Sequence, residues 1–290
     1  MSGRIVVGYI ANDSGADALA LGMRLARASD AILDVVMVLP SEAHNSTVPT
    51  DTGYERYLKG QSREWLAEAS ESLDDEDVVQ SLHVRYAESF AEGLIAAAHE
   101  FGASLIVVGA ARGGLLGRSR IGSVANELLH SSDVPVALAP AGSRNVPVTQ
   151  GVTRLTVAIG TRPGADALLE ASVQLATSTH VPLRLVSLVP IDLPAGLDEG
   201  LVELTGTVHA DEVLHTARRE LPASLDATAI AATGATIEEA VRAIDWHDGE
   251  LVLVGSSRLA APRHLFLGST AAKMLRELPV PMIVVPRTTS

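Results

Sequence analysis

The sequence has 290 residues, a formal net charge of −13 and no cysteine. This length predicts two domains, since a domain commonly holds about 150 residues. The acidic charge argues against nucleic acid or an anionic membrane as a partner, and the lack of cysteine excludes disulfides, thiolate metal sites and a thiol nucleophile. With 47% hydrophobic and only 3% aromatic residues, we expect globular domains with aliphatic cores.

No secretory or membrane-spanning segment is visible in the sequence. The N-terminus runs directly into a strand-like segment without the basic and apolar regions of a signal peptide. The longest apolar runs are shorter than the roughly 20 residues that cross a bilayer. These features predict a soluble, cytoplasmic protein.

Strand-like and helical segments alternate along the first half. Short apolar runs predict buried strands, and apolar residues at helical spacing, such as Leu19 and Met23, predict helices between them. Ser89 to Glu92 has the capping-box spacing that opens a helix. The expected strands are 4–9, 33–39, 78–86, 105–108 and 134–139, and the expected helices are 14–29, 54–73, 89–99 and 122–129.

The second half repeats this order. Its expected strands are 155–159, 183–189, 227–232, 251–254 and 280–285, and Thr236 to Glu239 again has capping-box spacing. Strands that alternate with helices predict a parallel sheet with helices on both faces. The fold class is therefore α/β, with two tandem Rossmann-like domains of five strands each.

An internal repeat supports this division. Residues 104–112 match 250–258, with Gly109 aligned to Gly255, and two further matches downstream keep the same offset. Near the start of each half, Gly-Ala-Asp-Ala-Leu occurs at 15–19 and again at 164–168. A Pro- and Gly-containing stretch separates the copies. We place the domains at 1–143 and 152–290, with a linker at 144–151.

Each half also carries a candidate phosphate site. The fourth strand ends in glycine, Gly109 or Gly255, and after a loop a Gly-Ser pair opens a helix. Free amides at a helix start attract phosphate, and ligands of open parallel sheets bind beyond the carboxyl ends of the strands. Arginines on the loops add positive charge. The candidate residues are Gly122, Ser123, Val124, Arg112, Arg118 and Arg120 in the first half, and Gly268, Ser269, Thr270, Arg258 and Arg263 in the second. The alternative is that Gly-Ser is only a helix cap and the arginines are solvated.

These residues resemble the universal stress protein family, whose members share an adenine nucleotide alpha hydrolase-like fold. The family has an ATP-binding pattern, Gly-x2-Gly-x9-Gly-Ser/Thr, after its fourth strand. Both halves match its spacing, with Arg112 and Arg258 in place of the second glycine. The resemblance covers nearly the whole chain and implies one ATP or related nucleotide per domain, a nucleotide-binding role in the stress response, and no catalysis.

The resemblance also implies contacts for the adenine. Val38 and Leu188, at the ends of the second strands, are expected to border it. The family usually places a nucleotide-contacting Asp at the end of the first strand, and here this position is Ile10 in the first half and Ile159 or Gly160 in the second. Asp13 lies close by, where it is expected to cap the following helix.

These sequence features leave three functions to compare. The first is a regulatory nucleotide-binding module. The second is a degenerate tandem module, with pockets filled by Arg112 and Arg258, that acts through protein–protein contacts. The third is an adenine-nucleotide enzyme, which is disfavoured because Walker A, nucleophile-elbow and paired-carboxylate patterns are all missing.

The resemblance also implies how the halves assemble. Family members pair through their last strands, so residues 134–139 are expected to pair with 280–285 as an internal pseudo-dimer, and a further homodimer is possible on the same logic. Trp65 and Trp246 are expected to pack in the core or an interface. The scattered histidines form no metal-ligand set.

Overall fold

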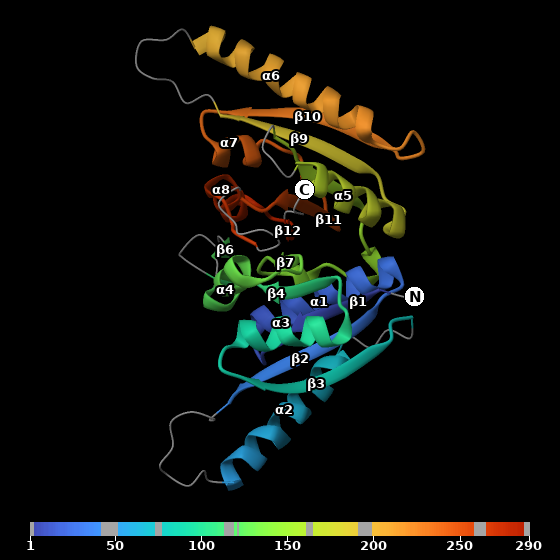
Figure 1. Cartoon of the computed structure of the whole chain (residues 1–290), viewed down its shortest axis with the longest axis vertical. Coiled ribbons are helices and arrows are strands. Elements are labelled where there is room, and N and C mark those ends of the chain that lie inside the picture. Colours follow the sequence, from blue (N-terminus) through green and yellow to red (C-terminus); the bar gives the residue numbers. More distant parts are fainter. Residues whose placement is uncertain are drawn as a thin grey trace.

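The computed structural model describes residues 3–41, 52–72, 77–112, 119–120, 122–160, 165–190, 199–257 and 265–286 (Figure 1). Its main feature is a single 10-stranded sheet in the order β10-β9-β8-β11-β12-β7-β4-β1-β2-β3. The first half supplies β1 (Arg4–Gly8), β2 (Ile32–Pro40), β3 (Gln80–Ala87), β4 (Leu105–Gly109) and β7 (Val136–Ala139). The second half supplies β8 (Arg154–Ala158), β9 (Leu183–Pro190), β10 (Ala227–Gly234), β11 (Glu250–Gly255) and β12 (Met282–Val285).

Helices cover both faces of the sheet. The bounds are α1 (Asp13–Ser29), α2 (Thr52–Ser72), α3 (Phe90–Phe101), α4 (Ser123–Ser131), α5 (Ala165–Thr179), α6 (Glu199–Glu220), α7 (Ile237–Arg242) and α8 (Ser269–Glu277). One apolar core lies beneath α1, α2, α5 and α6, and a second lies beneath α3, α4, α7 and α8. Each core contains residues of both halves, so the two halves are packed together on both faces.

The two halves join through one antiparallel strand pair. Within each half every neighbouring pair of main-sheet strands is parallel, but β12 runs antiparallel to β7, with Ile283 opposite Ala137. This confirms the expected internal pairing of the last strands. Both strands are shorter than expected because Pro135 and Pro281 precede them, and a proline has no N–H to donate to a ladder.

The caps of α3 and α7 are those that the sequence predicts. Ser89 accepts a hydrogen bond from the backbone N–H of Glu92 (3.1 Å), and Thr236 accepts one from Glu239 (3.2 Å). Asn12, rather than Asp13, caps α1 by accepting from the N–H of Gly15 (3.1 Å). The expectation for the cap of α1 was therefore displaced by one residue.

The expectation for Trp65 was wrong. Leu66 is buried beneath α2, but Trp65 is 37% exposed. Consecutive helical residues point about 100° apart, so both cannot face the sheet at the centre of the buried stripe. Trp246 is half-buried as expected, and its Nε1–H donates to the carbonyl of Val241 (2.9 Å).

The repeated Gly-Ala-Asp motif has a structural role in the first half. A side chain at Gly15 would collide with the backbone carbonyl of Ile10, so only glycine allows this close approach at the start of α1. Asp17, nearly fully buried, accepts hydrogen bonds from the backbone N–H groups of Gly142 (3.1 Å) and Arg144 (3.0 Å). The motif therefore fastens the turn after β7 to α1.

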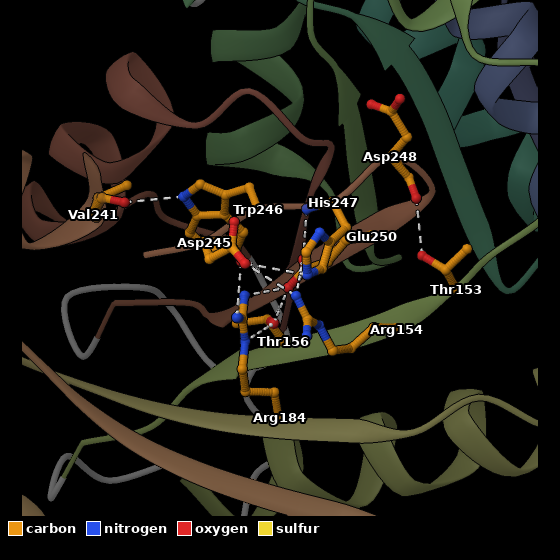
Figure 2. Close-up of polar contacts among 10 residues, drawn as sticks. All are labelled: Thr153, Arg154, Thr156, Arg184, Val241, Asp245, Trp246, His247, Asp248 and Glu250. Carbon is orange, nitrogen blue, oxygen red and sulfur yellow. Dashed lines mark hydrogen bonds and ion pairs between the residues drawn. The ribbon is translucent and has the colours of Figure 1, made fainter. Parts of the chain in front are cut away.

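A buried charge cluster lies at the amino ends of the second-half strands (Figure 2). Glu250 is fully buried and accepts hydrogen bonds from Arg154 (2.7 Å), from Arg184 and from the hydroxyl of Thr156. The Nε–H of Arg184 donates to Thr156 (2.9 Å), and its guanidinium lies 5.1 Å from the ring centroid of Trp246. Burial lowers the pKa of Arg184, although Glu250 opposes this shift. The cluster ties β8, β9 and β11 together through side chains as well as through the ladder.

The first half places a different ion pair in the same region of its sheet. Asp34, fully buried on β2, accepts two hydrogen bonds from Arg4 on β1 (2.9 and 2.6 Å) and lies 2.9 Å from Nε2 of His83. Phe101 packs near both Arg4 and His83, as Trp246 packs near Arg184. The buried acid therefore comes from the second strand in one half and from the fourth strand in the other.

We expect Glu250→Gln to destabilise the protein strongly. The change removes the negative charge that compensates two partly or fully buried arginines, and breaking such a pair costs about 3–5 kcal/mol of unfolding free energy. Glu100→Gln is the matched control, because Glu100 pairs with Arg85 at the surface and such pairs contribute below about 1 kcal/mol. Urea unfolding of both variants measures the difference. Equal losses of unfolding free energy in the two variants would show that the cluster around Glu250 contributes no more than a surface ion pair.

Candidate functional site

The candidate site lies where strand order reverses. In the first half β1 pairs with β2 on one side and β4 on the other, and in the second half β8 pairs with β9 and β11 in the same way. A crevice outside the carboxyl ends of such strands is the usual ligand position in an open α/β sheet. The helices α4 and α8 begin after β4 and β11, which places Gly122 and Gly268 at this edge.

The starts of α4 and α8 differ from those of the other capped helices. Gly122 and Gly268 are the N-caps, neither provides a side-chain cap, and neither helix has an acidic residue in its first turn. By contrast, α1, α3 and α7 each have a capping side chain and an acid in the first turn. At both helix starts the N-cap residue itself therefore offers no acceptor to the first amides, and the first turn offers no competing carboxylate.

The hydroxyl-bearing residues predicted for this site lie beside those amides. Ser123 and Ser269 are exposed at the first helical positions, and Thr270 is half-buried behind Ser269. Val124 is half-buried and packs against the core beneath α4. The structure thus brings each predicted Gly-Ser pair to the edge of the sheet, with its hydroxyl accessible.

The loops between the fourth strands and these helices have the same backbone plan. In the first half β5 (Ala111–Arg112) pairs antiparallel with β6 (Ser119–Arg120). In the second half the N–H of Ser257 donates to the carbonyl of Phe266 (2.8 Å), at the equivalent place. Arg118, Arg258 and Arg263 lie outside the described residues, as do the side chains of Arg112 and Arg120. Their predicted approach to a phosphate therefore stays a prediction.

In the first half the turn after β1 packs tightly against the end of β4. A side chain at Gly109 would collide with the backbone of Ser14, and the hydroxyl of Ser14 donates to the carbonyl of Ala110 (3.3 Å). Ile10 is 39% exposed at the end of β1. Glycine at position 109 is thus required for this contact between the two backbones, at the place where strand order reverses. The predicted contact of Ile10 with a nucleotide stays a prediction.

The remaining predicted residues lie partly in the core. Val38 is buried beneath α3, where its methyl groups would meet any side chain at Gly93. Leu188 is half-buried near the end of β9, Ile159 is buried and Gly160 is exposed. Gly255 ends β11, with Leu168 as its neighbour. The adenine contacts of Val38 and Leu188 stay predictions.

A contact missed by the sequence reasoning links the second-half loop to the first half. The N–H of Leu265 donates to the carbonyl of Ser132 (2.8 Å), just after α4, and the ring of Phe266 packs edge-on against His130 at 4.9 Å between centroids. Because Leu265 and Phe266 lead into Gly268, the start of α8 is attached to the other half of the protein. No sequence signal marks this contact.

Tyr9 is a titratable group that directly follows β1 at this edge of the sheet. Burial, with a smaller contribution from Glu68, raises the pKa of Tyr9 at the end of β1, so this phenol stays neutral near pH 7. Within the described ranges, no three His, Asp or Glu residues are grouped to hold a metal ion. The described helices also include none that is long and apolar enough to cross a membrane.

The two doubly wound halves define a tandem α/β protein with one continuous sheet. The model of the universal stress protein family matches residues 1–140 and 151–286. The chain therefore belongs to the universal stress protein family, and it carries two copies of the family domain.

Relatives extend the match over nearly the whole chain. Universal stress protein Rv2319c of Mycobacterium tuberculosis is 30% identical over 97% of this chain and 99% of its own length. A universal stress protein from Archaeoglobus fulgidus, solved by crystallography, superposes with a TM-score of 0.71 at 17% identity and covers 99% of both chains. PA1789 from Pseudomonas aeruginosa, a protein of unknown function, superposes with a TM-score of 0.61 at 16% identity, over 98% of this chain and 92% of its own. These structures share the fold of the whole tandem chain.

We expect Gly109→Ala to destabilise the first half. The added methyl group meets the Ser14 backbone rather than a mobile side chain, and overpacking of this kind costs about 1–3 kcal/mol. Gly60→Ala is the control, because nothing lies near a side chain at this position inside α2, and there alanine should stabilise by about 0.5–1 kcal/mol. The midpoint temperature of thermal unfolding should therefore fall in Gly109→Ala and rise in Gly60→Ala. A shared direction would contradict the close approach at Gly109.

Proposed function

We propose that this universal stress protein binds an adenine nucleotide, with ATP as the expected ligand, as a regulatory ligand and not as a substrate. The observation that carries the proposal is the pair of uncapped, acid-free helix starts at Gly122 and Gly268. Phosphate oxygens would accept hydrogen bonds from these amides and from the adjacent Ser123 and Ser269 hydroxyls. The adenine part of the proposal comes from the resemblance of both loops to the ATP-binding pattern of the family.

The position of the second loop supports a regulatory role. Leu265 and Phe266 contact Ser132 and His130 of the first half, so a ligand that orders the start of α8 would also affect packing between the halves. A ligand changes a conformational equilibrium only by its difference in affinity for the two states. We call the amides and hydroxyls at Gly122-Ser123 and at Gly268-Ser269 the two cradles. We propose that the protein with occupied cradles differs in this contact from the protein with empty cradles, and that a partner protein distinguishes the two states.

Absence of catalysis is part of the same proposal. A phosphoryl-transfer enzyme needs groups that neutralise developing charge on the phosphates and position a nucleophile. Lys59 and Lys273 are the only lysines, and neither belongs to the predicted phosphate loops. We therefore expect bound ATP to be released unchanged over many binding cycles.

Ser123→Asp with Ser269→Asp tests the cradles directly. An acid in the first turn favours the helix through its dipole but repels phosphate, so ATP affinity should fall at least about tenfold, or about 1.4 kcal/mol, without loss of thermal stability. Ser123→Ala with Ser269→Ala keeps the amides and should weaken binding only a few-fold. Isothermal titration calorimetry with ATP measures both effects.

Ser224→Asp is the charge control, because Ser224 is exposed in the turn before β10, away from both helix starts. It should leave ATP affinity unchanged. If the unmodified protein binds no ATP in calorimetry and releases no nucleotide on denaturation, the degenerate module that acts through protein contacts alone becomes the better function.

A further inference from the structure

On the face of the sheet covered by α1 and α5, we call the space between each of these helices and the other half of the chain a groove. Helices α1 and α5 occupy equivalent places in the two copies and contact each other. The antiparallel pairing of β7 with β12 relates the copies by an approximate two-fold axis, so each helix faces the amino ends of the strands in the other half. The two grooves would be identical if the copies were identical.

The segment 143–153, which joins the halves, occupies the groove beside α1. Its first turn, Ser143–Asn145, is held by Asp17, and its second, Val148–Gln150, contacts α1. Val148 and Val152 pack against the core, and the N–H of Thr153 then donates to the carbonyl of Gly249 (3.0 Å) at the amino end of β11. This groove therefore holds aliphatic side chains delivered by a short, irregular segment.

The groove beside α5 contains a cavity of about 680 Å³. Ser178 of α5 and Ser29 of α1, which occupy matching positions in the repeat, both line it. A cavity of this volume at a junction of two domains is in the usual range for small-molecule sites. It is well separated in the fold from the starts of α4 and α8, which cover the opposite face of the sheet.

The inner wall of this cavity is apolar. Both halves supply buried aliphatic side chains to it, and these include Ile5, Leu25, Leu105, Leu253, Ile283 and Val285. Close-packed interiors rarely leave space of this size, and water gains few hydrogen bonds against aliphatic walls. An apolar group that entered the cavity would replace poorly bound water.

The polar side chains that line the cavity mainly offer hydrogen-bond acceptors. The hydroxyl protons of Ser29, Ser104 and Ser178 are donated to the backbone carbonyls of Leu25 (2.7 Å), Arg4 (3.3 Å) and Leu175 (3.0 Å). The serine oxygens therefore keep lone pairs for a ligand.

The charge at the cavity also favours a ligand that donates hydrogen bonds. Asp30 adds a carboxylate, Gln174 adds an amide, and no described lining residue is Lys, Arg or His. Asp30, Ser104, Gln174 and Ser178 are all exposed, so the polar groups stand near the mouth. A ligand with a hydrogen-bond donor or a positive charge at its polar end suits this mouth, and an anion does not.

We propose that this cavity binds a small, mainly apolar molecule whose polar end is an amine or hydroxyl group. Its apolar part lies against the aliphatic wall shared by the two halves, and its donor end lies near Asp30 and the serine oxygens. Such a ligand contacts α1, α5, β1 and β12 together, so its binding stabilises the junction of the halves. The proposal does not depend on nucleotide binding.

A matched set of eight-carbon probes tests the chemistry. We expect n-octylamine to bind most tightly by calorimetry, 1-octanol to bind more weakly, and octanoate to bind at least tenfold more weakly than the amine. Asp30→Asn should remove the preference for the amine over the alcohol, because the charge is lost. Asn tolerates the left-handed backbone of residue 30 (φ 50°), so this variant should fold normally.

Two α5 variants test the location. Ala171 lines the cavity, so Ala171→Phe should fill it and abolish binding of all three probes, whereas Thr177→Phe, on an exposed residue of the same helix outside the lining, should leave binding unchanged. Ser123→Asp with Ser269→Asp should also leave probe binding unchanged. The proposal is overturned if no probe binds at millimolar concentration, if octanoate equals octylamine, or if both α5 variants behave alike. Should Ala171→Phe fail to fold, the Asp30→Asn result decides.

Discussion

The antiparallel pairing of β7 with β12 is the constraint on which the architecture depends. It converts two five-stranded parallel sheets into one sheet whose outer strands, among the residues that the structure describes, are β3 and β10. Strands with helices on both faces must be apolar on both sides, which explains the aliphatic composition. The same pairing brings α1 against α5 and the second-half loop against α4. Both the candidate cradles and the cavity are therefore consequences of how the halves meet.

The two halves keep one fold with different internal chemistry. In the first half the buried Asp34 on the second strand pairs with the half-buried Arg4, and in the second half the buried Glu250 on the fourth strand pairs with the buried Arg184. At the position that corresponds to Asp34 in the strand register, the second half has Arg184. What is retained is a compensated charge near an aromatic ring, since an unpaired one would be costly. The fold thus constrains the sum of the charges in this region and not their individual positions.

The sequence was sufficient for features that depend on neighbouring residues or on the repeat. Strand and helix order and the caps of α3 and α7 followed from spacing and from the match between copies, and the pairing of the last strands followed from the resemblance to the family. The cluster around Glu250 did not, because its partners at Arg154 and Arg184 are remote in the chain and each strand reads as an ordinary apolar run. The close approach of the Gly109 and Ser14 backbones was likewise not predictable, since glycine at this position also fits a phosphate loop. Trp65 was misassigned because helical periodicity alone does not show how wide the buried face of α2 is.

Attachment of the start of α8 to the first half has a consequence for the proposed regulation. Leu265 is bonded to Ser132, and α4, which ends beside Ser132, begins at the first cradle. A ligand at the start of α8 that changes this bond therefore changes the surroundings of α4, and by linkage a ligand at α4 must change affinity at α8 by the same factor. Two uncoupled domains joined by a flexible linker would have no such reciprocity. Because the linker is itself fixed to α1 through Asp17, the tandem arrangement favours a coupled pair of sites over two independent ones.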